Sequence, residues 1–247
     1  MSDCGACQDG VAAPFPIAMA FQPIVDLDRR NVFAYEALVR GPEGQPAAEV
    51  LARVDAHNRY AFDQTCRVTA IETAARLGLV ATGARLSINF LPAAVYRPEN
   101  CLRATLRTSH AMGLPLDRLM FEVTENEPVQ DPTHLLDIFR EYHRQGFLSA
   151  IDDFGAGYAG LTLLAKFQPD IIKIDMELTR SIDEKPVART IVGAIVQVCR
   201  TLGIAIVAEG VETDAELASL RDLGVTLFQG YLFGRPAFQA LPVPAGL

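Results

Sequence analysis

Short apolar runs alternate with longer amphipathic segments along most of this 247-residue chain. The short runs favour strands, and the longer segments, several of which end at a glycine, favour helices. Seven of the strand-like runs stop on a polar residue that could hold a metal or a phosphate. These strand ends are Tyr35-Glu36, Ile88-Asn89, Phe121-Glu122, Ile151-Asp152-Asp153, Ile172-Lys173, Ala208-Glu209 and Phe228-Gln229. This alternation of strands, polar strand ends and helices is typical of a (β/α) barrel. A doubly wound sheet would instead place its ligand-binding residues at one switch point.

The first expected strands break the regular alternation. Phe21–Val25 and Val32–Val39 are joined by a turn so short that they must pair antiparallel. The predicted fold class is therefore α/β, a modified TIM (β/α)8 barrel with one antiparallel strand. We expect residues 1–18 to be a flexible leader and residues 19–247 to form one domain. Helices are expected at 47–57 and 62–77, followed by alternating strands and helices at 85–90, 100–112, 119–123, 132–145, 148–152, 160–167, 170–174, 187–202, 205–208, 215–223 and 226–228.

The amino-acid composition argues against several classes of protein. Asp and Glu number 30 against 22 Lys and Arg, a net charge of −8 that argues against binding polymeric nucleic acid through a basic face. The five cysteines form no framework spacing, and the Cys4–Cys7 pair lacks a second pair for a zinc site. Free thiols without a signal peptide indicate the cytoplasm, and no apolar run approaches the ~20 residues that a membrane span needs.

Carboxylates dominate the expected strand ends. Taken singly, Glu36, Asn89 and Glu122 could each be an ordinary surface or turn residue. Gathered at one end of a barrel, they would repel one another unless cations lay between them. Oxygen ligands of this kind suit Mg²⁺ or Mn²⁺, and two such ions about 4 Å apart can clamp a phosphoryl displacement. Adjacent Asp152 and Asp153 fit this hypothesis, because one carboxylate can bridge two ions while its neighbour reaches the second.

Other motifs in the chain have competing interpretations. Gly155, Gly157 and Gly160, with Asp175 further on, match a dinucleotide-binding fingerprint. We reject that interpretation because Asp152 and Asp153 stand where a pyrophosphate would approach. Lys173 lies among apolar residues, so it is either an ion-pair partner of the carboxylates or a group that handles protons. The four histidines show no ligand spacing.

The motifs together resemble those of EAL-domain cyclic-di-GMP phosphodiesterases, over roughly Phe21 to Pro236. The segments around Phe33 and Phe167 are most similar to the EAL modules of BLUF–EAL proteins. The motifs that carry the resemblance are Phe21-Gln-Pro-Ile24, Glu36-Ala-Leu-Val-Arg40, Ser87-Ile-Asn89, Phe121-Glu-Val-Thr-Glu125, Asp152-Asp-Phe-Gly-x-Gly-Tyr158, Ile172-Lys-Ile-Asp175, Ala208-Glu-Gly-Val-Glu212 and Gln229-Gly-Tyr231.

The resemblance implies hydrolysis of cyclic di-GMP to linear pGpG with two divalent cations, Mg²⁺ or Mn²⁺. Ca²⁺ is expected to inhibit, because its larger and looser oxygen shell suits a tight two-metal site poorly. It implies catalytic roles for Lys173 and Glu209, with Lys173 holding or deprotonating the attacking water. Glu125 would brace the glycine-rich loop, and Asp175 and Glu212 would lie at the edge of the site. The implied metal ligands are Glu36, Asn89, Glu122, Asp152, Asp153 and Glu209, and the implied substrate-binding residues are Gln22, Arg40 and Gln229. A homodimer is also expected, because dimers are common in this family.

Two alternatives to an active phosphodiesterase remain. The loop carries Ala159 and Gly160 where the family often has two serines, which leaves open a silent module that senses cyclic di-GMP or binds a protein partner. An enolase-type barrel with a lysine base is the second alternative, but it would need a capping domain for which the chain has no length. An unknown regulatory partner is compatible with each interpretation.

Overall fold

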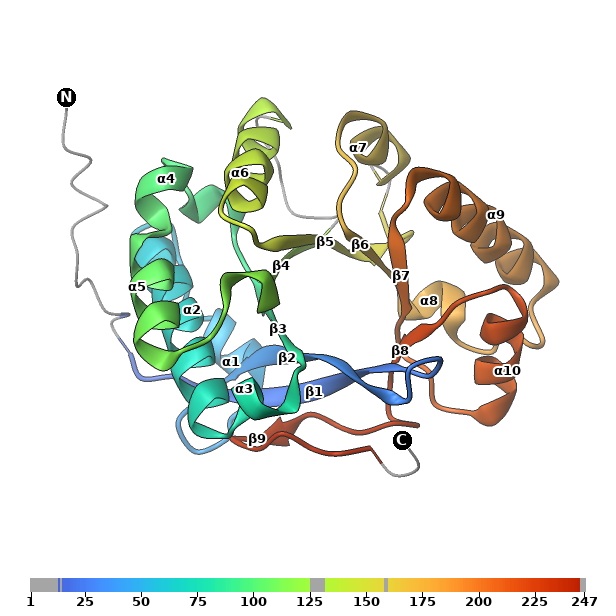
Figure 1. Ribbon diagram of the computed structural model, residues 1–247, viewed down its shortest axis with the longest axis horizontal. Helices are drawn as coiled ribbons and strands as arrows, with labels where there is room; N and C mark the ends of the chain where they lie inside the picture. Colours follow the sequence, from blue (N-terminus) through green and yellow to red (C-terminus); the bar gives the residue numbers. More distant parts are fainter. Residues whose placement is uncertain (1–12, 14, 125–131, 158–159, 245–247) are drawn as a thin grey trace.

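The structure is a computed structural model that describes residues 13, 15–124, 132–157 and 160–244 (Figure 1). Its strands are β1 (Ala18–Asp26), β2 (Asn31–Arg40), β3 (Arg85–Asn89), β4 (Leu119–Thr124), β5 (Leu148–Phe154), β6 (Ile171–Ile174), β7 (Ala205–Ala208), β8 (Leu227–Gln229) and β9 (Ala237–Phe238). Its helices are α1 (Ala47–Leu51), α2 (Arg59–Arg76), α3 (Leu79–Thr82), α4 (Pro98–Cys101), α5 (Arg103–Met112), α6 (Pro132–Arg144), α7 (Gly160–Lys166), α8 (Met176–Thr179), α9 (Pro186–Leu202) and α10 (Asp214–Asp222), with 3-10 turns η2 (Pro92–Ala94) and η3 (Leu116–Arg118).

The strands close into a barrel. Parallel pairing runs from β2 to β8 in chain order, and β1 completes the circle by pairing antiparallel with both β8 and β2. The predicted α/β barrel with one reversed strand is confirmed. β9 adds an extra strand against the outer part of β1, a pairing that the sequence pattern did not predict. Figure 1 shows α2 and α5 at one side of the barrel and α9 and α10 at the opposite side.

A small apolar cluster fills the barrel interior away from the polar strand ends. Each strand from β1 to β8 except β3 contributes one buried residue to it, namely Ile24, Ala34, Met120, Ala150, Ile171, Val207 and Leu227. Two larger clusters lie between the outer barrel wall and the helices, one mainly around β2–β4 and one around β5–β8. Packing on both faces of the sheet explains why its strands read as apolar runs. The interior cluster leaves the opposite end of the barrel available for polar side chains.

Two local predictions differ from the structure. The helix expected over 47–57 ends at Leu51, because the Asp55 side chain accepts hydrogen bonds from the backbone N–H groups of His57 and Asn58 at 2.8 and 3.0 Å. A side chain that captures nearby backbone donors competes with helix continuation. The strand expected from Phe21 begins at Ala18, and Phe15 is already buried against Val50 and Phe62. Packing therefore starts a few residues before the predicted domain boundary.

Among the residues that the structure describes, every helix is too short or too polar to span a bilayer.

Candidate active site

The period-two geometry of strands sets which side chains reach the barrel mouth. The interior residues Met120, Ala150, Ile171 and Val207 are followed two positions later by Glu122, Asp152, Lys173 and Glu209. Successive side chains of a strand point to opposite faces, so both members of each pair point inward. In the reversed strand β1 the order is inverted, and Gln22 precedes the interior residue Ile24. The same alternation places Glu36 two residues after Ala34.

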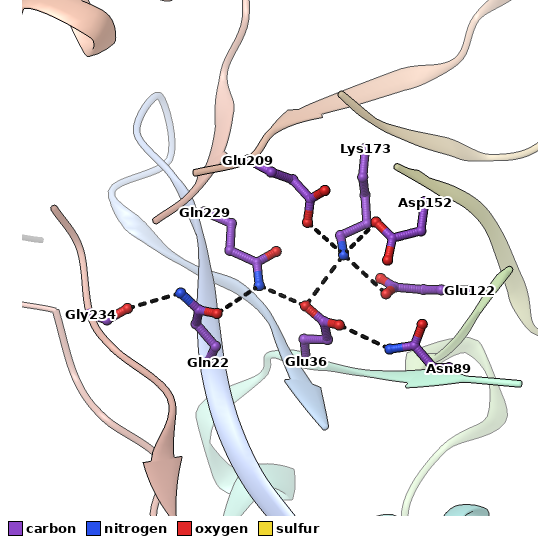
Figure 2. A network of polar contacts seen from close by, with 9 residues as sticks. All are labelled: Gln22, Glu36, Asn89, Glu122, Asp152, Lys173, Glu209, Gln229 and Gly234. Carbon is purple, nitrogen blue, oxygen red and sulfur yellow. Dashed lines mark hydrogen bonds and ion pairs between the residues drawn. The ribbon is translucent and has the colours of Figure 1, made fainter. Parts of the chain in front are cut away.

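Lys173 is the centre of the polar cluster. Its side chain is fully buried, and Nζ contacts one oxygen from each of four carboxylates (Figure 2). The distances are 2.8 Å to Glu209 Oε1, 3.0 Å to Asp152 Oδ1, 3.1 Å to Glu122 Oε2 and 3.3 Å to Glu36 Oε2. Of the two interpretations of Lys173, the geometry supports the ion-pair partner.

Amide side chains extend the network from Glu36. Asn89 Nδ2 donates to Glu36 Oε1 at 2.9 Å, and Gln229 Nε2 donates to Glu36 Oε2 at 2.7 Å. Gln229 Nε2 also lies 3.3 Å from Gln22 Oε1, and Gln22 Nε2 donates to the backbone carbonyl of Gly234 at 3.2 Å. Figure 2 shows these contacts as one chain leading from Gly234 to the carboxylates around Lys173. The predicted residues Gln22, Glu36, Asn89 and Gln229 are therefore brought together.

Burial and charge shift the ionisation of this cluster. Burial alone would lower the pKa of Lys173, but the four carboxylates raise it well above its ordinary value. Lys173 therefore carries its charge at neutral pH. Burial raises the pKa of Glu122 to about 8, with Lys173 opposing the effect and Glu36 and Asp152 adding to it. Burial likewise raises the pKa of Glu209. Without further cations, one ammonium cannot keep all of these carboxylates ionised at low energetic cost.

The donor set fits divalent metal ions. Two carboxylate trios each offer ligand atoms within 4.8 Å of one another, Glu36–Glu122–Asp152 and Asp152–Asp153–Glu209. Asp152 belongs to both trios. Glu122 Oε1 is buried with no hydrogen-bond partner among the described residues, which is costly for a carboxylate oxygen unless something else binds it. All-oxygen ligands with a shared carboxylate are suited to a pair of hard cations such as Mg²⁺ or Mn²⁺.

Asp153 reaches the mouth by a backbone irregularity. The pairing of β5 with β6 shifts register between Ile151 and Phe154, and Asp153 has φ +53°, in the left-handed region that non-glycine residues rarely adopt. A regular strand would turn Asp153 away from Asp152, but the bulge brings it into the second trio. Burial, with Asp152 and Asp175 adding to it, raises the pKa of Asp153 to about 6.

A cavity of about 420 Å³ opens beside the carboxylates. Its lining includes five predicted metal or substrate residues, Gln22, Glu36, Asp153, Glu209 and Gln229, and the two predicted edge residues, Asp175 and Glu212. It also includes Met176, Arg180 and Tyr231, which the sequence did not mark as site residues. Tyr231 could have been found from its place directly after the Gln229-Gly230 strand end. Arg180 carries no such signal, because it lies beyond the strand end and its partner is distant in sequence.

Arg40, a predicted substrate-binding residue, is not among the residues that line the cavity. It closes β2, and its Nη1 donates to the adjacent Val39 carbonyl at 2.7 Å. Its role toward a phosphate stays a prediction. Glu125 and the Tyr158–Ala159 pair lie outside the described residues. Asp175 accepts the backbone N–H of Glu177 at 2.7 Å and so caps α8 at the edge of the cavity.

A family model described as the EAL domain matches residues 16–236 of the chain. Two solved structures share the fold and much of the sequence. A standalone versatile EAL protein from Vibrio cholerae O395, in a c-di-GMP-bound form, is 48% identical with a TM-score of 0.90, and the match covers 94% of this chain and 97% of that one. Klebsiella pneumoniae BlrP1, in a complex with manganese and cyclic di-GMP, is 38% identical with a TM-score of 0.85, covering 93% of this chain and 58% of that one.

The curated relatives of the chain include a protein named as an antirepressor and one named as a phosphodiesterase. The blue light- and temperature-regulated antirepressor BluF of Escherichia coli is 33% identical over 223 residues, which is 90% of this chain and 55% of BluF. The cyclic di-GMP phosphodiesterase RocR of Pseudomonas aeruginosa is 37% identical over 123 residues, which is 50% of this chain and 31% of RocR. The aligned part of the chain thus spans about half or less of the length of these relatives.

Proposed function

The chain belongs to the EAL-domain family, and on that premise we propose that it hydrolyses cyclic di-GMP to linear pGpG with two divalent cations. The observation that carries the proposal is the pair of carboxylate trios that share Asp152 at the mouth of the barrel. RocR is named as a phosphodiesterase of this dinucleotide, and BlrP1 holds the dinucleotide together with manganese. The two carboxylate trios of this chain supply oxygen ligands of the kind that suits divalent cations.

Glu36, Asn89, Glu122 and Asp152 would hold one Mg²⁺ or Mn²⁺ ion, and Asp152, Asp153 and Glu209 the other. Bound there, the ions would lower the pKa of a bound water and carry negative charge on the phosphate. Asn89 Nδ2 already donates to Glu36 Oε1. A flip of the Asn89 amide would place its oxygen where Nδ2 now lies, beside the Glu36 carboxylate. Glu125, known here from its sequence position, would brace the loop that follows Asp153.

The protein's own groups have distinct tasks in this proposal. Lys173 Nζ, held as an ammonium, donates hydrogen bonds and orients the attacking water rather than accepting its proton. Glu209, 2.8 Å from Lys173 Nζ, would act as an ionised ligand of the second cation, because a carboxylate binds a metal ion in its deprotonated form. Gln229 and Gln22 keep Glu36 oriented. Arg40 would meet a substrate phosphate through its guanidinium.

A second candidate function is a module that binds cyclic di-GMP, or a protein partner, without cleaving it. The similarity to BluF, named as an antirepressor, favours this alternative. The charged Lys173 and the complete carboxylate set weigh against it, since binding alone requires neither.

The deciding experiment compares binding with product formation. The purified chain is incubated with cyclic di-GMP and Mg²⁺ or Mn²⁺, and the products are separated by chromatography. We expect pGpG from the parent, and a loss of about 10²–10³-fold for Lys173→Ala, which removes a positioned hydrogen-bond donor, with binding retained. Exposed Lys166→Ala is the matched control. Tight binding by the parent without pGpG, with either metal, would make the chain a sensor.

We also propose that the chain forms a homodimer through α9. Val187, Ile191, Val198 and Leu202 are exposed on one side of this helix, opposite the buried Val192, Val196 and Cys199. An exposed apolar stripe of this length along one helix is suited to a second copy of itself, as in two-fold symmetric interfaces. Ile191→Glu should shift the mass measured by sedimentation toward the monomer, and Gln197→Glu, outside the stripe, should not. A parent that sediments as a monomer at micromolar concentration would contradict the proposal.

A further inference from the structure

Ser87 is a polar residue at a level of the barrel interior where the other strands place apolar ones. The apolar cluster in the barrel takes one side chain from β1, β2 and each of β4 to β8, and β3 places Ser87 at the corresponding position. Ser87 precedes Asn89 by two residues, just as Met120 precedes Glu122, so its side chain points inward. Its side chain is fully buried. A hydroxyl buried in apolar surroundings is costly unless it finds a hydrogen-bond partner.

The strand register places Ser87 between this apolar level and the metal-binding carboxylates. Ser87 pairs with Glu36 on β2 and with Met120 on β4. Paired residues of neighbouring strands point to the same face, so Ser87 has a carboxylate on one side and an apolar side chain on the other. Figure 2 shows Glu36 and Glu122 pointing toward Lys173, and these two carboxylates come from the strands that flank β3. Ser87 therefore adjoins the first of the two carboxylate trios.

The carboxylate of Glu122 is the partner that the structure offers to Ser87. Burial is the largest influence on the pKa of Glu122 and raises it, whereas hydrogen bonding by the Ser87 hydroxyl lowers it. Ser87 Oγ and Glu122 Oε1 are both buried, and neither has another hydrogen-bond partner among the described residues. A hydroxyl proton rotates to suit its surroundings, so Ser87 can donate to this oxygen.

A hydrogen bond from Ser87 is compatible with metal binding by Glu122. A carboxylate oxygen has two lone pairs, so Oε1 can accept the hydroxyl proton and still bind a cation. The other oxygen, Oε2, lies 3.1 Å from Lys173 Nζ. A carboxylate held by the hydroxyl at one oxygen and by the ammonium at the other has its plane fixed before a cation binds. Carboxylates that bind metal ions are commonly held by hydrogen bonds of this kind.

We propose that Ser87 is a positioning residue of the metal site, whose hydroxyl orients the Glu122 carboxylate toward the cation held by Glu36, Glu122 and Asp152. The inference rests on the proposed function, which supplies the two-metal site. A merely structural role for Ser87 leads to a different expectation. Removing a buried hydroxyl that has no function is nearly neutral or stabilising, and it leaves metal binding unchanged.

Mn²⁺ affinity measured without substrate tests the inference. In calorimetric titrations Ser87→Ala should bind Mn²⁺ about 10- to 100-fold more weakly than the parent. Ser87→Thr and Ser87→Val have nearly the same shape as each other and differ in the hydroxyl, so this pair separates hydrogen bonding from packing. We expect Ser87→Thr to bind Mn²⁺ about 10-fold more tightly than Ser87→Val.

Turnover gives a second measurement. Formation of pGpG by Ser87→Ala should need correspondingly more Mn²⁺ to reach half of its maximal rate. The rate at saturating Mn²⁺ should fall much less, because Ser87 acts through Glu122 and does not touch the substrate.

Ser109→Ala is the matched control. The Ser109 hydroxyl is also fully buried and has no hydrogen-bond partner within the described part of the chain, but it lies on α5, outside the barrel. Its removal should leave Mn²⁺ affinity unchanged, and thermal unfolding in EDTA checks that each variant keeps the fold.

The inference is overturned if Ser87→Ala binds Mn²⁺ within about twofold of the parent, or if Ser87→Thr and Ser87→Val bind it equally. A parent that binds Mn²⁺ but forms no pGpG would overturn the proposed function, while the affinities of the Ser87 variants would still decide the role of Ser87. A parent that binds no Mn²⁺ would overturn both.

Discussion

Lys173 Nζ lies 2.8 Å from Glu209 Oε1, the shortest of its four contacts with carboxylates. The two residues come from neighbouring strands β6 and β7, and both face the interior of the barrel. The ammonium therefore occupies the centre of the group of oxygens that would bind metal. A divalent cation entering this group competes with Lys173 for the same partners.

This competition predicts how metal changes stability. Lys173→Met removes the buried counter-charge, so in EDTA the variant should lose about 3–5 kcal/mol of unfolding free energy relative to the parent. Mn²⁺ should restore much of the loss, because cations replace the missing charge. Urea unfolding with EDTA and with Mn²⁺ measures both effects, and exposed Lys166→Met serves as the control. Equal stabilisation of parent and variant by Mn²⁺ would contradict the competition.

Asp152→Asn should impair both metal positions, because Asp152 is the residue shared by the two trios. We expect activity to fall by orders of magnitude and Mn²⁺ binding to weaken, with the thermal midpoint little changed. Calorimetric titration with Mn²⁺ and pGpG chromatography are the measurements. The exposed Asp137→Asn on α6 is the control. Turnover by Asp152→Asn at the parental rate would remove Asp152 from the mechanism.

Calcium should inhibit product formation. Ca²⁺ binds oxygen at about 2.3–2.6 Å with six to eight ligands, so it fits poorly in a site suited to ions that bind at about 2.0–2.1 Å. We expect cyclic di-GMP binding to persist in Ca²⁺ while pGpG formation falls well below that in Mg²⁺ or Mn²⁺. Chromatography of the products in each metal gives the comparison, and comparable rates in Ca²⁺ and Mg²⁺ would refute the expectation.

The Glu216 carboxylate should stabilise the fold at neutral pH. Although burial opposes it, backbone N–H donors at Ser181, Glu212 and Thr213 lower the pKa of Glu216 below its ordinary value of 4.5. Its contribution is therefore present above that value and is lost as the pH falls through the lowered pKa of the folded state. Glu216→Gln should cost about 1–2 kcal/mol at pH 7 and progressively less below pH ~4.5.

Urea unfolding of the parent and Glu216→Gln across this range measures the difference. Asp214→Asn, an exposed acid in the first turn of the same helix, is the control. A stability difference that stays constant down to pH ~3 would show that the charge of Glu216 is not what stabilises the loops.

The strand-end residues could be predicted because their placement follows from local geometry. Once β4, β5 and β6 are recognised, alternation alone sends Glu122, Asp152 and Lys173 into the barrel. Asp153 was expected to act together with its neighbour Asp152, but it joins the trio of Asp152 and Glu209 through a bulge and a left-handed backbone. No residue pattern in β5 signals that irregularity.

The contacts between loops could not be predicted from the sequence. Arg180 meets Glu212 because Glu216 and Gly210 hold two loops together, and neither relation follows from spacing along the chain. The end of α1 shows a similar limit. Apolar periodicity continues past Leu51, but hydrogen bonds from the backbone to Asp55 end the helix. In each case contacts that apolar periodicity does not reveal decide the local conformation.

The reversed direction of β1 has a consequence for engineering. Ala18 pairs with Arg40 at the end of β2 nearest the mouth, so the chain enters the barrel beside its entrance rather than at the opposite end. Phe15, just upstream, is anchored between α1 and α2 in the same cluster as Leu91, two residues beyond Asn89. A light- or ligand-responsive module fused ahead of Phe15 with a short linker would therefore be mounted at the entrance, where its movement would gate access directly.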